Sequence, residues 1–384
     1  MSAIDEALKR ALATGAAPGL VAAAATRDMI FYEGAFGRRS AAAPEPMTKD
    51  SVFRIFSMTK AVASVAAAKL VERGQLHLDA PVESIVPAFG ELKVLEGFDG
   101  DRPILREPRH KATVRNLATH TSGLVYEFWN ANIAKYLQVT GAPNFLSGKK
   151  QGLMYPLVFE PGERWDYGIG IDWLGMVIEA VSGKKLDAFC RDEIFTPLGM
   201  TDTDFECEGE RRNRLVTVHA RGADGAMSVI SLDPPPHPEI YGGGYGLYST
   251  ARDFMQFLLM MLNNGKGNGA EILKPATIDL LLRNQIGELN VGKLTTVIPQ
   301  ISCDAEFFPG MASKHSLMSL INTEPVPGMR AAGSHCWAGA LNTYFWFDPA
   351  RAIAGVILMQ FLPFADPQAL GALGDFERTV YAGR

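Results

Sequence analysis

The sequence predicts an α+β fold of the α/β-sandwich type, with one domain built from both ends of the chain and a helical region inserted into it. Strand-like segments occur near both termini, whereas the residues between them form helical segments broken by Pro and Gly loops. We therefore assign residues 1–76 and 285–384 to the α/β domain and residues 77–284 to the mostly helical region. A functional site is expected between the two parts.

The N-terminal segment predicts a short helix, a hairpin and a long helix. Residues 1–12 have the pattern of an amphipathic helix, and residues 18–38 contain two apolar runs separated by Arg27-Asp28, a composition typical of a β-hairpin. The next helix begins at Ser57 and ends at Gly74, since glycine is a common helix stop.

The middle of the chain predicts further helices, and the end predicts strands. Asp172 and either Ser249 or Thr250 have the side chains expected of N-caps. The predicted helices cover residues 172–181, 252–262, 275–283 and 366–381, and the predicted strands cover residues 315–322, 340–347 and 352–361. The last two strands are joined by Asp348-Pro-Ala-Arg351, a turn composition.

The composition excludes several classes of function. The chain has 384 residues, is 47% hydrophobic and 21% charged, and carries a formal net charge of −5 without a long basic run. We therefore expect neither a nucleic-acid partner nor a membrane. Its 4 cysteines are far apart and form no Cys-x-x-Cys, and the N-terminus lacks the apolar core of a signal peptide. The expectation is a reduced, soluble, cytoplasmic protein.

One lysine stands out within an apolar helix. Lys60 follows Ser57 by three residues, and residues 61–68 carry no charge. Side chains three apart share a helix face, so the amine can reach the hydroxyl; a desolvated lysine has a lowered pKa and can take a proton from it. The alternative is a capping serine and a lysine that pairs with a carboxylate or extends to solvent. Spacing alone does not decide, because Ser-x-x-Lys also occurs at Ser147/Lys150 and Ser182/Lys185.

The wider pattern resembles the serine β-lactamase and penicillin-binding-protein superfamily, in its class C branch. The segments that carry the resemblance are Phe53–Lys60, Leu117–Leu124, Pro161–Gly175, Gly242–Asp253 and His335–Ala340, in the family's order. The resemblance implies a β-lactamase/transpeptidase-like fold, with an antiparallel sheet flanked by helices and an inserted helical domain.

Two departures narrow the resemblance to esterases. The asparagine of the Tyr-x-Asn motif is replaced by Ile169, and Lys-Thr-Gly is replaced by Trp337-Ala338-Gly339. A Trp-x-Gly triplet is what family VIII carboxylesterases show, and fungal-type acyltransferases of simvastatin synthesis also resemble the pattern. Without the second lysine an anionic β-lactam loses its cationic partner, whereas an indole offers apolar surface to a neutral ester.

The resemblance implies a mechanism with no cofactor and no metal. Ser57 is the nucleophile, and Lys60 and Tyr167 share its proton; Tyr167 is assigned as the base, with Lys60 lowering its pKa, although the sequence does not separate the two roles. The backbone N–H groups of Ser57 and Ala340 form the oxyanion hole. The expected substrate pocket consists of Trp337, Ala338, Gly339, Trp129 and Ile169.

The predicted function is a serine esterase that hydrolyses short-acyl carboxylic esters through an acyl-enzyme on Ser57, with at most slow β-lactam hydrolysis. The partner is a small-molecule ester. Enzymatic alternatives are an acyltransferase and a β-lactamase or D-amino-acid peptidase of the same fold; a different class is a non-catalytic, ligand-binding member. The sequence contains neither the Gly-x-Ser-x-Gly motif of α/β-hydrolases nor the His-Glu-x-x-His motif of zinc metalloproteases, so these two classes are disfavoured. His120 is interpreted as scaffold and not as a base.

Overall fold

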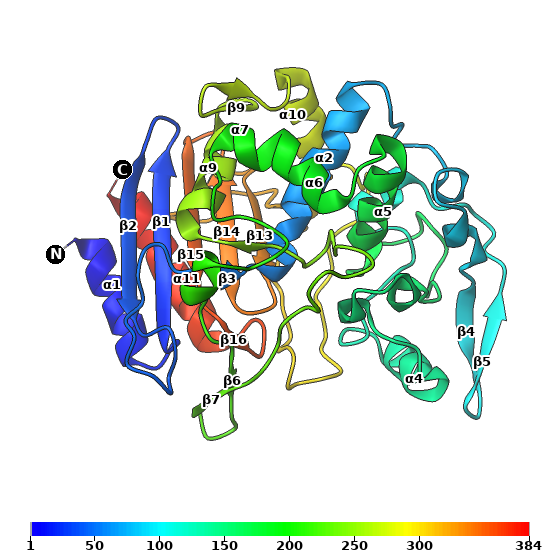
Figure 1. Cartoon of the computed structure of the whole chain (residues 1–384), viewed down its shortest axis with the longest axis horizontal. Helices are drawn as coiled ribbons and strands as arrows, with labels where there is room; N and C mark the ends of the chain where they lie inside the picture. Colours follow the sequence, from blue (N-terminus) through cyan, green and yellow to red (C-terminus); the bar gives the residue numbers. More distant parts are fainter. Residues whose placement is uncertain (1, 384) are drawn as a thin grey trace.

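The computed structural model describes residues 2–383 and contains a seven-stranded antiparallel sheet with the order β11-β12-β13-β14-β15-β1-β2. Its strands are β1 (Gly19–Thr26), β2 (Ile30–Gly37), β11 (Lys314–His315), β12 (Leu320–Ile321), β13 (His335–Gly339), β14 (Thr343–Asp348) and β15 (Ile353–Leu358). Because β1 pairs with β15, the two ends of the chain meet in one sheet, as Figure 1 shows at the left. The predicted α+β fold with an antiparallel sheet is confirmed.

Helices cover both faces of this sheet. Neighbouring residues of a strand point to opposite faces, so Phe345 and Trp346 of β14 identify what lies on each side. Phe345 packs against Phe254 of α9 (Ala251–Leu262), with ring centroids 5.1 Å apart. Trp346 packs against Phe376 of α11 (Pro367–Ala382), at 5.4 Å. Burial on both faces explains why β14 and β15 read as nearly uninterrupted apolar runs.

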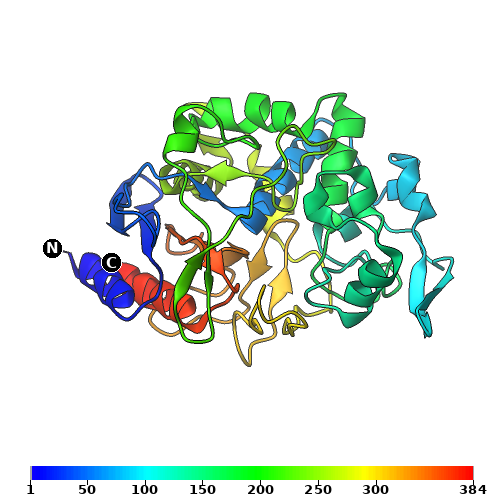
Figure 2. The same cartoon turned by 60° about the horizontal axis from the view of Figure 1, so that its bottom comes forward.

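Helix α1 (Ala3–Ala13) lies beside α11, so the first and last helices pack side by side, as both views show (Figures 1 and 2). Ser2 caps α1 with a capping box that also involves Asp5, and Asp366 caps α11 through the backbone of Gln368 and Ala369. The two chain ends are thereby fixed on the face of the sheet opposite α9.

The segment between β2 and β11 forms the remaining helices and several small sheets, and in Figure 1 the β4–β5 hairpin lies farthest from the main sheet. The helices are α3 (Val114–Ala118), α4 (Ala131–Thr140), α5 (Gly170–Ser182), α6 (Leu186–Cys190), α7 (Thr196–Leu198), α8 (Glu210–Asn213) and α10 (Pro275–Leu282). The short strands of this segment are β3 (Phe53–Arg54), β4 (Val94–Asp99), β5 (Arg102–Arg106), β6 (His219–Arg221), β7 (Met227–Val229), β8 (Tyr248–Ser249), β9 (Lys266–Gly267) and β10 (Ala270–Glu271). Strand β16 (Phe361–Leu362), which follows β15, pairs with β6. Although α9 belongs to the range 77–284, it packs on β1 and β15.

Helix α2 (Thr59–Glu72) runs between the sheet and the helical region and packs against α5, α6 and α10. It is preceded by a 3-10 turn, Phe56–Met58. A helix that is apolar on all sides is expected to be buried, and all of its residues from Thr59 to Ala68 are. Lys60 is among them, with 1% of its surface exposed. No helix within residues 2–383 combines the length and the apolar character needed to cross a bilayer.

Three local expectations were wrong. Residues 315–322 form two short strands and not one, because Ser316 N–H donates to Ser319 O and turns the chain. The strand expected over 340–347 begins at Thr343, since Asn342 adopts a left-handed conformation with φ 58°. Asp172 lies inside the first turn of α5 and does not cap it; Ile169 occupies the N-cap position.

Candidate active site

Ser57 and Lys60 are brought together by the turn that opens α2. Ser57 lies in the 3-10 turn, and the Lys60 Nζ is 2.9 Å from its Oγ. Phe56, directly before the serine, has φ +42°, a left-handed conformation that is uncommon for a bulky residue. Backbone strain is therefore located next to the expected nucleophile.

The Lys60 amine is completely enclosed by polar partners. Besides Ser57, its Nζ donates to the Tyr126 hydroxyl at 2.9 Å and to the Gly244 carbonyl at 2.8 Å. Burial lowers the pKa of Lys60 to about 7, and the negative charge of Asp172 opposes that shift. A large fraction of Lys60 is therefore neutral near pH 7 and able to accept a proton from Ser57.

Asp172 is connected to Lys60 through the backbone of one residue, Gly244. Its Oδ1 accepts a hydrogen bond from Gly244 N–H at 2.8 Å, while the carbonyl of the same glycine accepts from Lys60. Burial raises the pKa of Asp172 to about 6, and Lys60 opposes the shift. A Cβ on Gly244 would lie 2.6 Å from Asp172 Oδ2, so the close approach requires glycine here. The backbone of Gly244 is thus in buried contact with α5.

Tyr167 is buried beside the same pair. Its hydroxyl accepts a hydrogen bond from Trp337 Nε1 at 3.3 Å and is hydrogen-bonded to Ser57. Burial raises the pKa of Tyr167, and its bonds to Ser57 and Trp337 oppose the rise, so the phenol is protonated at neutral pH. Lys60 Nζ lies 4.8 Å from the centre of the Tyr167 ring, and it donates hydrogen bonds to Ser57, Tyr126 and the Gly244 carbonyl instead. This geometry differs from the expectation that Lys60 lowers the pKa of Tyr167.

Gly339 allows β13 to approach the nucleophile turn. A Cβ at this position would lie 2.1 Å from the Ile55 carbonyl oxygen and 2.3 Å from Thr343 Oγ1. Thr343 Oγ1 also donates to that carbonyl at 3.2 Å. The contact places Ala340, the residue after the strand, on the same cavity as Ser57. Both residues expected to supply oxyanion N–H groups therefore lie at one site.

Two lobes of a cleft meet at Ser57. The first, about 30 Å³ in volume, is lined by Ser57, Phe128, Trp129, Tyr167, Leu294, Ile301, Phe307, Trp337, Ala338, Gly339, Ala340 and Phe364. The second, about 100 Å³, is lined by Phe56, Ser57, Tyr126, Glu127, Phe128, Asn144, Phe145, Leu146, Leu232, Tyr245, Ile301, Ala340 and Leu362. The expected pocket residues Trp129, Trp337, Ala338 and Gly339 all line the first lobe. Ile169 lines neither; it is fully buried where α5 begins.

A family model described as Beta-lactamase matches residues 4–377 of the chain. The chain belongs to the beta-lactamase family. Within the family it is 30% identical over 376 residues to a lovastatin esterase of Penicillium rubens, covering 93% of this chain and 92% of the relative. It is 29% identical to a monacolin J acid methylbutanoyltransferase of Aspergillus terreus, covering 99% and 95%. Its beta-lactamase-family relatives therefore include both an esterase and an acyltransferase.

Solved structures share this fold. Unliganded simvastatin synthase from Aspergillus terreus superimposes with a TM-score of 0.84 at 26% identity, over 99% of this chain and 97% of the other. EstCE1, described as a hydrolase with promiscuous acyltransferase activity, superimposes with a TM-score of 0.78 at 24% identity, over 99% and 97%. The second likeness supports the fold alone.

Three polar residues of the beta-lactamase-family site were missed by the sequence analysis. Tyr126 contacts Lys60, Asp172 reaches it through Gly244, and Glu127 lines the second lobe. Tyr126 and Glu127 follow the Leu117–Leu124 segment closely, and this position is the sequence feature that could have identified them as site residues. His120, interpreted as scaffold, lies behind Tyr167 with ring centroids 4.8 Å apart and lines neither lobe.

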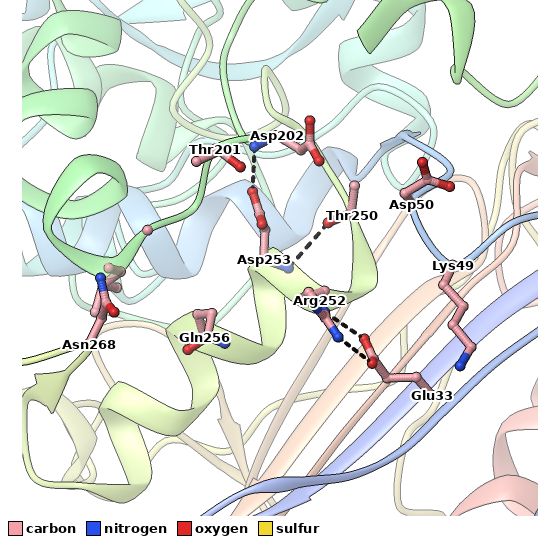
Figure 3. A pocket seen from close by; sticks show the side chains of 12 residues that line it. Glu33, Lys49, Asp50, Thr201, Asp202, Thr250, Arg252, Asp253, Gln256 and Asn268 are labelled. Carbon is pink, nitrogen blue, oxygen red and sulfur yellow. Dashed lines mark hydrogen bonds and ion pairs between the residues drawn. The ribbon is translucent and has the colours of Figure 1, made fainter. Parts of the chain in front are cut away.

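Two polar features lie outside the cleft. A larger cavity of about 590 Å³, shown in Figure 3, is lined by none of Ser57, Lys60 and Tyr167, and its Arg252 is paired with Glu33 at 2.7 Å. Within residues 2–383, one set of side chains brings three potential metal ligands together, namely Glu206, Glu208 and His237. They line neither lobe of the cleft, so the chemistry proposed for Ser57 requires no metal from them.

Proposed function

We propose that this protein is a serine esterase that hydrolyses short-acyl carboxylic esters through an acyl-enzyme on Ser57. The observation that carries the proposal is the 2.9 Å contact between Ser57 Oγ and Lys60 Nζ, at a position where burial lowers the pKa of the lysine to about 7. A neutral amine at hydrogen-bond distance is what a serine hydroxyl needs to become a nucleophile. The resemblance to a lovastatin esterase supports ester cleavage.

In acylation, Ser57 Oγ attacks the ester carbonyl and its proton passes to Lys60. The carbonyl oxygen becomes an oxyanion, which the N–H groups of Ser57 and Ala340 would hold. As the carbon–oxygen bond breaks, the neutral Tyr167 phenol donates its proton to the leaving alkoxide. Water that enters the cleft then returns a proton to the Tyr167 phenolate and takes up the proton held by Lys60, so both groups regain their starting states. Water repeats the sequence on the acyl-enzyme and releases the acid. Lys60 is thus the base and Tyr167 the acid, which reverses the assignment expected from the sequence.

A neutral ester suits this cleft better than an anionic β-lactam. Trp337 and Phe307 line the first lobe in a stacked arrangement, with ring centroids 5.5 Å apart. Of the lysines and arginines among residues 2–383, none lines either lobe. An aromatic wall stabilises apolar groups but provides no ion pair for a carboxylate. We expect kcat/KM for a chromogenic cephalosporin to remain below that for p-nitrophenyl acetate.

Acyl transfer to an alcohol is the second candidate. A methylbutanoyltransferase is among the relatives, and the apolar first lobe could accommodate an alcohol as well as water. The two reactions differ in whether an added alcohol captures the acyl group. Product analysis of p-nitrophenyl butanoate turnover in the presence of a primary alcohol distinguishes them, since transfer yields the new ester and hydrolysis yields butanoate.

Hydrolysis of p-nitrophenyl acetate tests the main proposal. Ser57→Ala removes the nucleophile and should reduce kcat about 10³-fold or more, to the residual level left by binding and the oxyanion hole. Ser147→Ala is a matched control, because Ser147 also precedes a lysine by three residues but lines neither lobe. Equal rates for the wild-type protein and Ser57→Ala would reject the proposal and leave a non-catalytic member of the fold.

A further inference from the structure

The position of Tyr167 orients an ester in the two-lobed cleft. In the proposed function the leaving alkoxide takes its proton from the Tyr167 phenol, so the alcohol part must lie in the lobe that this side chain lines. Tyr167 lines the first lobe and not the second. The acyl chain of the substrate therefore occupies the second lobe.

The acyl lobe contains one acidic side chain in an otherwise largely apolar wall. Glu127 lines it together with Phe128, Phe145, Leu146 and Leu232. Glu127 is buried, with 9% of its surface exposed. Its Oε2 accepts a hydrogen bond from the Tyr155 hydroxyl at 3.2 Å, and the Asn144 side chain is a second partner. Within residues 2–383, no lysine, arginine or histidine forms an ion pair with it.

A buried carboxylate without a cation is costly, and these two neutral partners compensate for it only in part. Burial raises the pKa of Glu127, while the hydrogen bonds of its own backbone, Tyr155 and Asn144 oppose the rise. A carboxylate has about four acceptor positions, so some remain for a ligand. The Tyr155 oxygen also accepts from Phe145 N–H at 3.2 Å, which directs its proton towards Glu127. The glutamate is therefore held in place and still lacks a positive partner.

We propose that the second lobe is a binding site for acyl groups that carry a primary ammonium, which pairs with the Glu127 carboxylate. The substrate class would then be esters of short amino-substituted acids, with the amine at the far end of the acyl chain. The orientation rests on the proposed function of Ser57 and Tyr167, but the binding preference can be measured without turnover. Glu127 would be a specificity-determining residue, whose effect depends on the amine of the substrate.

Matched pairs of esters test this preference in catalysis. The pairs are p-nitrophenyl 3-aminopropanoate with butanoate, and 6-aminohexanoate with heptanoate, in which an ammonium replaces a methyl group. At pH 8, kcat/KM for each ester is divided by its rate of alkaline hydrolysis to remove intrinsic reactivity. We expect the amine to be preferred at least tenfold in at least one pair, and Glu127→Gln to reduce that preference at least tenfold.

The glutamine variant keeps an acceptor for Tyr155, so its fold should be retained. Glu163→Gln removes a carboxylate from the surface and should leave the preference unchanged, because Glu163 lines neither lobe. The inference would be overturned if, in the wild-type protein, the corrected kcat/KM of the amino ester were no higher than that of its methyl counterpart in both pairs. A preference that is the same in Glu127→Gln would also overturn it, because the amine would then be recognised elsewhere.

Binding to the Ser57→Ala protein separates this inference from the proposed function. Calorimetric titration with 6-aminohexanamide and heptanamide, and with 3-aminopropanamide and butanamide, should show at least tenfold tighter binding of one amine over its isostere. The preference should be lost in the Ser57→Ala/Glu127→Gln double variant. Equal or undetectable binding within both pairs overturns the inference. A retained preference in a protein that hydrolyses no ester would reject the proposed function alone.

Discussion

The negative charge of Asp172 acts on Lys60, and this relation predicts a pH effect. The carboxylate raises the pKa of Lys60 against the effect of burial. Since the neutral amine is the proposed base, kcat/KM for p-nitrophenyl acetate should rise with pH through about 7, the pKa of Lys60. Asp172→Asn keeps an oxygen for Gly244 N–H but removes the charge, so the pKa should fall. We expect the midpoint of the rise to move ~1 pH unit lower.

The control for this shift is a second buried aspartate. Burial also raises the pKa of Asp253 to about 6, but Asp253 lines the separate polar cavity of Figure 3, where it accepts from Asp202 N–H at 2.7 Å. Asp253→Asn should leave the midpoint of the kcat/KM profile unchanged. If Asp172→Asn moves the midpoint upward or not at all, Asp172 does not set the charge state of Lys60 in the reacting enzyme.

The residues of the site differ in how readily the sequence predicts them. Ser57 and Lys60 are three residues apart across the 3-10 turn that opens α2, so local geometry brings them together, and Tyr167 is identified by its motif. Tyr126 and Asp172 reach Lys60 from other segments, and Asp172 does so through the backbone of Gly244, which side-chain identity does not reveal. Tyr126 and Tyr167 therefore both lie near Lys60. Only the folded structure shows that Tyr126 is hydrogen-bonded to Lys60 and that Tyr167 is hydrogen-bonded to Ser57.

Strand β13 positions one side of the proposed oxyanion hole, and Gly339 is the residue on which this depends. Gly339→Ala would place a methyl group 2.1 Å from the Ile55 carbonyl oxygen, so the strand end and Ala340 must move away from Ser57. Loss of one oxyanion donor costs about 3–4 kcal/mol in other serine enzymes, and a reduction of kcat by about 10²–10³-fold is therefore expected with p-nitrophenyl acetate.

Thermal melting shows whether that loss is local. Overpacking of this kind costs about 1–3 kcal/mol of unfolding free energy, so a cooperative transition at reduced Tm is expected for Gly339→Ala. The matched control is Gly371→Ala in α11, where a Cβ meets nothing within 4 Å. Wild-type kcat in a folded Gly339→Ala protein would contradict the role given to this strand end.

At the level of elements, the sequence predicted the long, regular segments and missed where short strands begin and end. The hairpin over residues 18–38 and the helices near 252–262, 275–283 and 366–381 are confirmed, and Thr250 caps α9 as one of the two alternatives. The turn through Ser316 and Ser319 and the left-handed Asn342 have no periodic signal, because each depends on hydrogen bonds or a conformation of single residues.

Buried histidines, among them His120, His315 and His335, link the stability of the whole molecule to pH. Burial lowers the pKa of His120 well below its ordinary value, that of His315 to about 4 and that of His335 to about 3. Below pH ~6.5 the unfolded chain takes up protons at these sites and the folded protein does not. As the pH falls, each histidine should therefore lower the free energy of unfolding by about 1.4 kcal/mol per pH unit, until the pH reaches the pKa of that histidine in the folded protein.

A single substitution separates the effect of one histidine on the free energy of unfolding from that of Asp172 and Asp253. Burial raises the pKa of both aspartates to about 6, so they increase the free energy of unfolding as the pH falls. His335 bonds to Ser319 Oγ at 2.9 Å and stacks on Phe347. In urea unfolding between pH 6 and 4, the free energy of unfolding of His335→Asn should fall less steeply than that of the wild-type protein, by about 1.4 kcal/mol per pH unit. The exposed His77 provides the control variant. Parallel pH dependences in His335→Asn and the wild-type protein would show that His335 is protonated in the folded state.

The overall arrangement was predictable where the two chain ends carry matching strand patterns, but the sequence does not show which face each helix covers. Helix α9 packs on the sheet because Phe254 meets Phe345, a contact between residues far apart in the chain. Likewise, the uncharged residues 61–68 predict that α2 is buried. Its contacts with α5 and α10 are known only from the folded structure. The boundaries 76/77 and 284/285 remain predictions.

Because the two lobes share Ser57 but are otherwise lined by largely different residues, the enzyme could exchange one reactant while it keeps the other. In the proposed orientation, the departing alcohol would empty the chamber beside Trp337, while the acyl chain would stay in the lobe lined by Glu127. The next molecule to enter that chamber, water or another alcohol, would decide whether an acid or a new ester is formed. We expect substitutions around Trp129 and Phe307 to change this partition ratio without altering which acids the protein prefers.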